Sequence, residues 1–241
     1  MNDLPETGRP VERIELEVGD PLVLDAARQA VVDARFAEVK ARNPALWNGP
    51  FFLFEAARIE GGAFRATARP TDYATFLAWR AEGFPGTLHS HVFPVPAVTT
   101  VDRRLLVGVM GGSTANAGLA YPPSGSFDHE DVVGDRLDPV ANMVRELGEE
   151  VGIEAGDLAA DPGFTVLSSG RRRLALVKRW RSPRRAADLA ASIAAHLGRE
   201  ADPELGGFDF VGFDHRFAAT KTVGYVNTLL GLLGSDALGG G

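Results

Sequence analysis

Residues 138–153, DPVANMVRELGEEVGI, carry the strongest structural signal in the chain. Asp138 suits the N-cap because its carboxylate can accept the first unpaired N–H groups, and Pro139 suits the first helical turn because no N–H is needed there. Apolar residues then recur at the three- and four-residue spacing of one helix face. Gly152 is placed to end the helix in a left-handed conformation. The stretch therefore predicts an amphipathic helix over 139–151.

Three carboxylates lie close together on this helix. Glu146, Glu149 and Glu150 fall at positions i, i+3 and i+4, within one arc beside the apolar face. A solvated acidic edge is the ordinary interpretation of such a cluster. However, like charges repel and the C-terminal end of a helix dipole disfavours anions, so a hard cation such as Mg²⁺ would relieve both penalties. Arg145 precedes Glu149 by four residues and can pair with it. The spacing alone leaves both interpretations open.

The same nine residues carry a family resemblance. Residues 145–153, RELGEEVGI, resemble the second half of the Nudix box, R-E-U-x-E-E-x-G-U, at every specified position. The resemblance covers about residues 90–235. It implies an α/β fold, a Nudix α/β/α sandwich with a mixed sheet.

The first half of the box departs from the family pattern. Gly125 stands for the box glycine, and Asp131 falls where the first box glutamate belongs. Thirteen residues then separate Asp131 from Arg145, where the family has seven, so six extra residues lie between loop and helix. Asp128 and Glu130 compete with Asp131 for the same role.

The resemblance also implies a metal site. Glu149 and Glu150 would be the main ligands of Mg²⁺, with Mn²⁺ as a substitute, and Glu146 would be a ligand or the general base. The backbone of Gly125 and the side chain of Asp131 are expected to complete the metal shell, and Arg145 is expected to orient the carboxylates.

By the same resemblance, the reaction is hydrolysis of a nucleoside diphosphate linked to another group. The metal neutralises phosphate charge and acidifies a water molecule, and a carboxylate takes the proton as the water attacks phosphorus. Some family members take this base from a later loop. The candidates there are Glu200, Asp202 and Glu204.

Several other side chains can contact a substrate. Tyr121 borders the catalytic loop and can stack on a base or sugar. Arg173 can bind phosphate with two N–H groups, although surface charge on a hairpin is the more ordinary role for the run Arg171–Arg173. Glu204 is a further candidate for substrate contact. The pair His89-x-His91 more simply marks the start of a strand than a metal site.

The elements around the helix complete the predicted Nudix domain. Residues 111–137 are rich in Gly, Ser, Asn, Asp and Pro, so we expect a long functional loop there. Period-two and apolar runs predict strands at 92–100, 104–110, 164–169, 173–180 and 208–213, and helical spacing predicts helices at 184–198 and 218–233.

The preceding residues predict a smaller α+β region. The expected elements are a strand at 12–18, a helix capped by Asp25 that ends near Asn43, strands at 51–60 and 63–70 around Gly61-Gly62, and a helix at 73–83. We expect an N-terminal region over 1–88, a Nudix hydrolase domain over 89–236 and a flexible tail over 237–241. The run LWNGP at 46–50 resembles the UDP-sugar-hydrolysing Nudix branch, which also carries extra residues in its box.

The amino-acid composition indicates which classes of partner and which cellular location to expect. The 241 residues include 45% hydrophobic residues and no cysteine, with a net charge of −7. An acidic surface argues against nucleic acid and anionic membranes as partners, and the sequence lacks an apolar run long enough to span a bilayer. The start of the chain does not have the pattern of a signal peptide. We expect a cytoplasmic protein with a small-molecule substrate, and the family resemblance allows a homodimer.

The leading hypothesis is therefore a Mg²⁺-dependent pyrophosphatase of a nucleoside diphosphate sugar such as UDP-glucose. The alternatives are an ADP-ribose or dinucleotide pyrophosphatase, and a Nudix-like domain that senses nucleotides without turnover.

Overall fold

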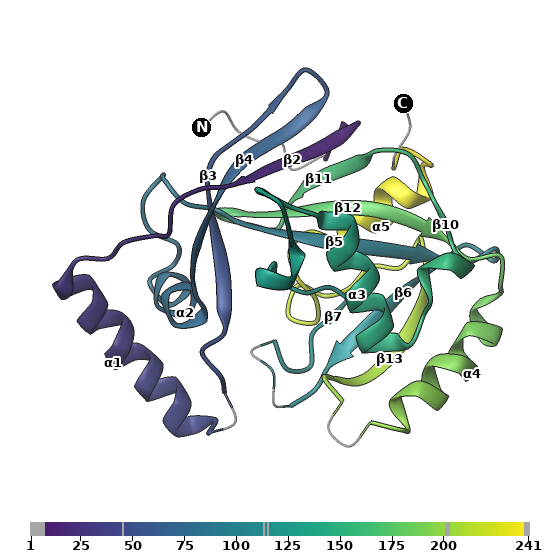
Figure 1. The fold of residues 1–241 in the computed structure, drawn as a ribbon. Helices are drawn as coiled ribbons and strands as arrows, with labels where there is room; N and C mark the ends of the chain where they lie inside the picture. Colours follow the sequence, from purple (N-terminus) through teal and green to yellow (C-terminus); the bar gives the residue numbers. More distant parts are fainter. Residues whose placement is uncertain (1–7, 45, 113, 115, 201–202, 239–241) are drawn as a thin grey trace.

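The protein has a mixed α/β architecture, as expected (Figure 1). The computed structural model describes residues 8–44, 46–112, 114, 116–200 and 203–238. Two mixed β-sheets and five α-helices are formed by this part of the chain. The helices are α1 (Ala26–Arg42), α2 (Tyr73–Ala81), α3 (Pro139–Val151), α4 (Ala186–Leu197) and α5 (Val226–Gly234).

The larger sheet, sheet A, has the strand order β1-β11-β12-β5-β6-β13. Strands β5 and β12 run parallel, and the other pairs along this path are antiparallel. Its strands are β1 (Arg9–Val11), β5 (His91–Thr99), β6 (Arg104–Met110), β11 (Phe164–Ser168), β12 (Arg173–Arg181) and β13 (Leu205–Gly212), with short β7 (Ala120–Tyr121) beside β6 and β10 (Ala159–Ala160) beside β12.

The smaller sheet, sheet B, has the order β3-β4-β2-β9-β8. Gly61 and Gly62 both have positive φ, 56° and 72°, and form the predicted tight turn of its long hairpin. Its strands are β2 (Arg13–Val18), β3 (Pro50–Glu60), β4 (Ala63–Asp72), β8 (Val132–Val133) and β9 (Arg136–Leu137).

Sheet A lies between helices. Val92 of β5 and its pairing partner Leu174 of β12 share an apolar cluster with Met143 of α3. The next residue of β5, Phe93, points to the opposite face and contacts the ring of Tyr225, which precedes α5. Helices α3 and α5 therefore cover opposite faces of sheet A, which gives the expected α/β/α arrangement.

The first 88 residues are joined to the rest of the chain in three ways. Strand β1 pairs with β11 at the edge of sheet A. The backbones of Phe54 and Ser90 exchange two hydrogen bonds of 2.8 and 2.7 Å. One apolar cluster also contains Leu16 and Phe54 together with Phe127 and Met143. The division at residue 88 stays a prediction, since both stretches contribute to one core.

Two predicted elements differ in the structure. The stretch 111–137 is not one long loop, because it contains β7, a 3₁₀ turn at His129–Asp131 and the hairpin β8–β9. The predicted helix over 218–233 begins only at Val226. Upstream of it, Lys221 accepts a backbone hydrogen bond from Ala120, and Thr222 forms an isolated β-bridge with Ala120, so this segment is held by tertiary contacts and turns in place of a helix.

The C-terminal segment ends on the core, and Leu238 is buried. The remainder of the predicted tail, residues 239–241, lies outside the described residues. Within the described part of the chain, none of the helices has the length and apolar character needed to cross a bilayer.

Phe54→Ala is expected to lower the free energy of unfolding by about 3–5 kcal/mol, because it empties space at the junction of the two sheets. Phe54 is fully buried, and its ring lies 5.8 Å from that of Phe127. Val23→Ala is the matched control, because Val23 is 86% exposed, and it should change stability by less than about 0.5 kcal/mol. Chemical denaturation of both variants measures the difference. Equal, small effects would contradict the shared core.

Candidate active site

Helix α3 has the predicted boundaries. Asp138 accepts hydrogen bonds from the backbone N–H groups of Val140 and Ala141 at 2.8 and 3.0 Å. At the other end, Gly152 has a φ of 63°, and the Ile153 N–H donates to the Leu147 carbonyl at 3.0 Å. These two capping arrangements set the ends of α3 at Pro139 and Val151.

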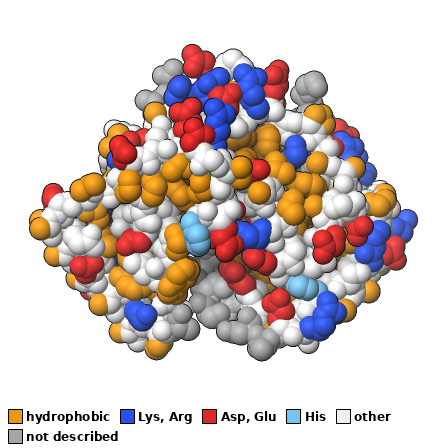
Figure 2. All heavy atoms as spheres, viewed as in Figure 1, with side chains coloured by type: hydrophobic (Ala, Val, Ile, Leu, Met, Phe, Trp, Pro, Cys, Tyr) orange, Lys and Arg blue, Asp and Glu red, His pale blue; other side chains and the backbone are white. Residues whose placement is uncertain are grey.

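Arg145 lies at the centre of an acidic cluster. Its Nη1 is 3.1 Å from Glu146 Oε1 and 3.1 Å from Glu149 Oε2. Its Nη2 is 3.4 Å from Asp131 Oδ1 and 3.8 Å from Asp128 Oδ2. Burial lowers the pKa of Arg145, but the surrounding carboxylates raise it more, so the guanidinium stays charged. In Figure 2, acidic side chains lie beside and below a small basic group near the middle of this face.

Asp131 is almost fully buried and makes structural contacts. Its Oδ2 accepts hydrogen bonds from Asn142 Nδ2 at 2.8 Å and from the Asp128 N–H at 3.0 Å. Together with the Arg145 contact, these bonds occupy both carboxylate oxygens. Asp131 therefore ties the 3₁₀ turn to α3. Glu130, its competitor at the sequence level, is exposed.

The six residues by which the chain exceeds the spacing of the Nudix pattern form the hairpin β8–β9, residues 132–137. The Asp138 N–H donates to the Asp131 carbonyl at 2.9 Å and closes the base of the hairpin. Without the hairpin, the seven residues 138–144 separate Asp131 from Arg145, which is the family spacing. The hairpin itself pairs with β2 through Glu17 and Arg136. The insertion therefore extends into sheet B and leaves the approach of loop to helix unchanged.

Glu146 and Glu150 are buried beneath the loop of residues 124–126. Gly125 packs directly against the Glu146 carboxylate, and a methyl group at this position would clash with it. The backbone of Ser124 donates a hydrogen bond to Glu150. The other oxygen, Glu150 Oε2, is buried without a hydrogen-bond partner among the described residues.

The pKa values of both buried carboxyl groups are raised. Burial raises the pKa of Glu146 to about 7; Arg145 opposes the rise, and Glu149 adds to it. Burial and the neighbouring Glu146 raise the pKa of Glu150 well above its ordinary value. Two adjacent acids that lose solvent in this way are stabilised by a proton or by a bound cation.

The three predicted metal ligands are not gathered into a cage. Glu149 is an exposed side chain that pairs with Arg145, whereas Glu146 and Glu150 are buried. Among the residues that the structure describes, no three His, Cys, Asp or Glu side chains form a group able to hold a metal ion. The unpartnered Glu150 Oε2, beside the buried carboxyl group of Glu146, nevertheless leaves one buried oxygen that a divalent cation could bind.

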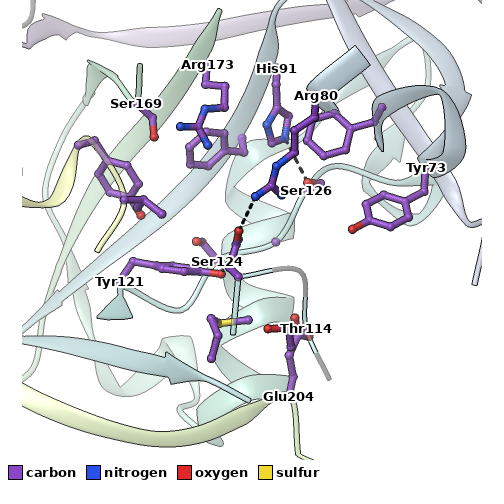
Figure 3. Close-up of a pocket in the computed structure, with 17 residues that line it drawn as sticks. Tyr73, Arg80, His91, Thr114, Tyr121, Ser124, Ser126, Ser169, Arg173 and Glu204 are labelled. Carbon is purple, nitrogen blue, oxygen red and sulfur yellow. Dashed lines mark hydrogen bonds between the residues drawn. The ribbon is translucent and has the colours of Figure 1, made fainter. Parts of the chain in front are cut away.

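A pocket of about 320 Å³ opens beside this loop (Figure 3). Its walls come from α2, the starts of β5 and β12, the loops around residues 110–126, and the segments before β13 and α5. The residues that line it are Tyr73, Phe76, Arg80, His91, Phe93, Met110, Thr114, Asn116, Tyr121, Ser124, Gly125, Ser126, Ser169, Arg173, Glu204, Val223 and Tyr225.

Four residues predicted from the sequence line this pocket: Tyr121, Gly125, Arg173 and Glu204. Burial raises the pKa of the Tyr121 phenol to about 12, so it stays protonated. Burial and Glu149 raise the pKa of Glu204.

The other two candidates for the general base are Glu200 and Asp202. Glu200 is exposed and pairs with His196 at 3.3 Å. Asp202 lies outside the described residues.

The sequence predictions missed the contribution of α2. Tyr73, Phe76 and Arg80 are spaced so that they share one face of that helix, and all three line the pocket. His91 is buried, and its Nε2 is 3.2 Å from Ser126 Oγ. Burial lowers the pKa of His91 to about 3, so this ring is neutral. The helical spacing on α2 was visible in the sequence, but its nearness to the box was not.

Comparisons with known proteins concern the fold. No family model and no curated protein matches the chain. A bifunctional NMN adenylyltransferase/ADP ribose pyrophosphatase from Francisella tularensis, solved with AMP and a Mn ion, is 12% identical over 65% of this chain and 44% of its own, with a TM-score of 0.42. A mutT/nudix family protein from Listeria innocua is 14% identical over 61% of this chain and 91% of its own, with a TM-score of 0.40.

A third similar structure is a Nudix hydrolase from M. smegmatis, RenU. It is 10% identical over 61% of this chain and 83% of its own, with a TM-score of 0.37. With identities of 14% or lower and TM-scores of 0.42 or lower, these three likenesses do not assign an activity to this chain.

The raised pKa of Glu146 predicts a pH dependence of stability in the metal-free protein. The folded state holds this proton from the ordinary pKa of 4.5 up to about 7, so it binds more protons than the unfolded state there. This contribution to stability is full below the lower value and is lost as pH rises through the higher one.

Glu146→Gln removes the titration and should flatten the fall in melting temperature between pH 5 and 8 by roughly 5 °C. Thermal unfolding in EDTA across this range tests the expectation, with Glu154→Gln as an exposed control. Parallel curves for wild type and Glu146→Gln would show that Glu146 titrates normally.

Proposed function

We propose that this chain hydrolyses the diphosphate bond of a nucleoside diphosphate linked to another group. The observation that carries the proposal is the buried pair Glu146 and Glu150, which lies directly behind the wall of a pocket that two arginines also line. An intact second half of the Nudix box supplies both glutamates.

Each residue of the cluster has a role in this proposal. Glu146, Glu149 and Glu150 would hold the metal, together with the backbone of Gly125. Arg145 and Asp131 orient these groups, because their ion pair joins the loop to α3. Bound there, Mg²⁺ or Mn²⁺ supplies positive charge against the diphosphate and acidifies water.

Glu204 is the general base in this proposal. It is the one member of the later-loop candidates, among the described residues, that lines the pocket. Its raised pKa brings it closer to neutrality, where a carboxylate accepts a proton most effectively. Water attack in line with the leaving phosphate then yields a nucleoside monophosphate and a second phosphorylated product.

The substrate class proposed is a nucleoside diphosphate sugar such as UDP-glucose. The pocket volume of about 320 Å³ suits a ligand that buries a sugar or base. Aromatic rings of Tyr73, Phe76 and Tyr121 line it and can pack against such a group. ADP-ribose and dinucleotides have the same diphosphate and are the nearest alternatives.

A nucleotide-binding protein without turnover is the second candidate. The observation in its favour is that Glu149 and Glu146 both pair with Arg145, so three carboxylates are not preassembled for a cation.

Incubation with Mg²⁺ and a panel of nucleoside diphosphate sugars, ADP-ribose, NADH and nucleoside triphosphates tests the proposal. Product analysis by chromatography is expected to show a nucleoside monophosphate from one substrate class. Nucleotide binding by calorimetry with no phosphate released from any panel member would overturn hydrolysis in favour of the second candidate.

Glu150→Gln is expected to reduce kcat by about two orders of magnitude or more, because it removes a charged metal ligand. The fold should survive, since the amide is nearly isosteric and the carboxyl is already buried. Glu154→Gln, an exposed change just after α3, is the matched control. Near-normal turnover by Glu150→Gln would contradict the metal site.

Glu204→Gln should lower kcat by about 100-fold while leaving the affinity for Mn²⁺ unchanged, because Glu204 acts on the proton and does not hold the metal. Glu200→Gln is the control from the same segment, and it should retain full activity. Turnover and Mn²⁺ binding by electron paramagnetic resonance separate the two roles. A loss of metal affinity in Glu204→Gln would reassign it as a ligand.

A further inference from the structure

Two arginines from distant parts of the chain face the same pocket. Arg80 lies at the end of α2 and Arg173 lies at the start of β12 (Figure 3). In the figure they converge at one end of the pocket with His91 between them, whereas Glu204 lies at the other end. Both guanidinium groups are close enough to His91 and to each other to interact electrostatically.

This pair of positive charges is not neutralised within the described part of the chain. Arg80 donates to the neutral amide oxygen of Asn116 at 3.1 Å. Arg173 stacks over the ring of Phe84 at 5.5 Å, and its Nε is buried without a hydrogen-bond partner. Neither arginine has a carboxylate within ion-pair distance among the described residues, although the chain as a whole is acidic.

Like charges that are held together and partly desolvated destabilise the folded state unless an anion joins them. Burial and the nearby charge of Arg80 both lower the pKa of Arg173, so the charged form of its guanidinium is destabilised in this pocket. The neutral His91 adds no positive charge, and its Nε2 contacts the hydroxyl of Ser126, which also lines the pocket. The site is therefore complementary to a compact anion that carries several oxygens.

We propose that Arg80 and Arg173 form a clamp that binds the diphosphate of the substrate, with the region before residue 88 supplying one of its two arms. The inference rests on the proposed function for the identity of the anion. A guanidinium donates paired hydrogen bonds to phosphate oxygens, and two of them can hold both phosphates of a diphosphate.

The clamp also makes α2 a determinant of substrate choice. Arg80 is anchored through Asn116, whose Nδ2 donates to the Tyr121 hydroxyl at 3.1 Å. Tyr73 and Phe76 lie on the same face of α2 and extend along the same wall. A diphosphate held by Arg80 therefore places its attached group beside these aromatic rings.

Calorimetric titration with inorganic pyrophosphate in EDTA, at constant ionic strength, tests the clamp without measuring turnover. Arg80→Gln and Arg173→Gln should each weaken binding by about tenfold or more, the usual value of a charged hydrogen bond. Arg80→Lys and Arg173→Lys keep the charge and lose the fork, so they should bind more weakly than wild type and more tightly than the glutamine variants.

Arg58→Gln is the matched control. Arg58 lies on β3, is exposed, pairs with Glu60 and does not line the pocket. Circular dichroism and melting temperature establish that each variant is folded. Sulfate, added in place of pyrophosphate, tests whether the site selects a diphosphate.

Wild-type affinity in either glutamine variant overturns the clamp, as does an equal loss in Arg58→Gln, which would indicate only the general charge of the protein. Absence of pyrophosphate binding to wild type, or sulfate binding of equal strength, also overturns it. Arginine-dependent binding without hydrolysis of any nucleotide would retain the clamp and reject the proposed hydrolysis. Nucleotide hydrolysis together with pyrophosphate binding that does not depend on either arginine would retain the proposed hydrolysis and reject the clamp.

Discussion

The guanidinium of Arg145 is the constraint on which the candidate site depends. It joins carboxylates from two segments, Asp128 and Asp131 on the 3₁₀ turn and Glu146 and Glu149 on α3. Loss of this one cation would leave several partly buried carboxylates without compensation, which costs more than the ion pairs themselves contribute. Because the turn is fixed to the helix in this way, Gly125 can pack against Glu146.

The pocket beside this cluster is built from segments that are far apart in the sequence, from Tyr73 to Tyr225. The helix α2 and the start of β5 form one wall, and Tyr121, Arg173 and Glu204 come from segments spread over more than eighty residues. The charges in the pocket are separated, since Arg80 and Arg173 lie toward one end and Glu204 lies at the other (Figure 3). In the proposed function, α2 and the loops would set the ligand preference of this pocket, and the glutamates of α3 would hold the metal.

Local rules predicted the elements whose ends are set by their own residues. Helix α3 matched its expected boundaries because a cap, a proline and a C-terminal glycine all lie within it. Helix α5 begins later than its pattern predicts, because Lys221 and Thr222 are drawn to Ala120, about a hundred residues away.

The same distinction holds for the site. The box glutamates and Gly125 could be named from the sequence, and the structure places Glu146, Glu150 and Gly125 together. Arg80 could not be named, since nothing near residue 80 indicates that α2 lines the same pocket as the loop of residues 124–126. The hairpin β8–β9 could not be predicted either, because its register depends on pairing with β2, which is distant in the sequence.

That hairpin decouples chain length from spatial separation, since one hydrogen bond between Asp138 and Asp131 closes it. Excursions of other lengths could therefore be accommodated at this point in related chains while the approach of Asp131 to Arg145 stays the same, and a sequence pattern with fixed spacing would miss them.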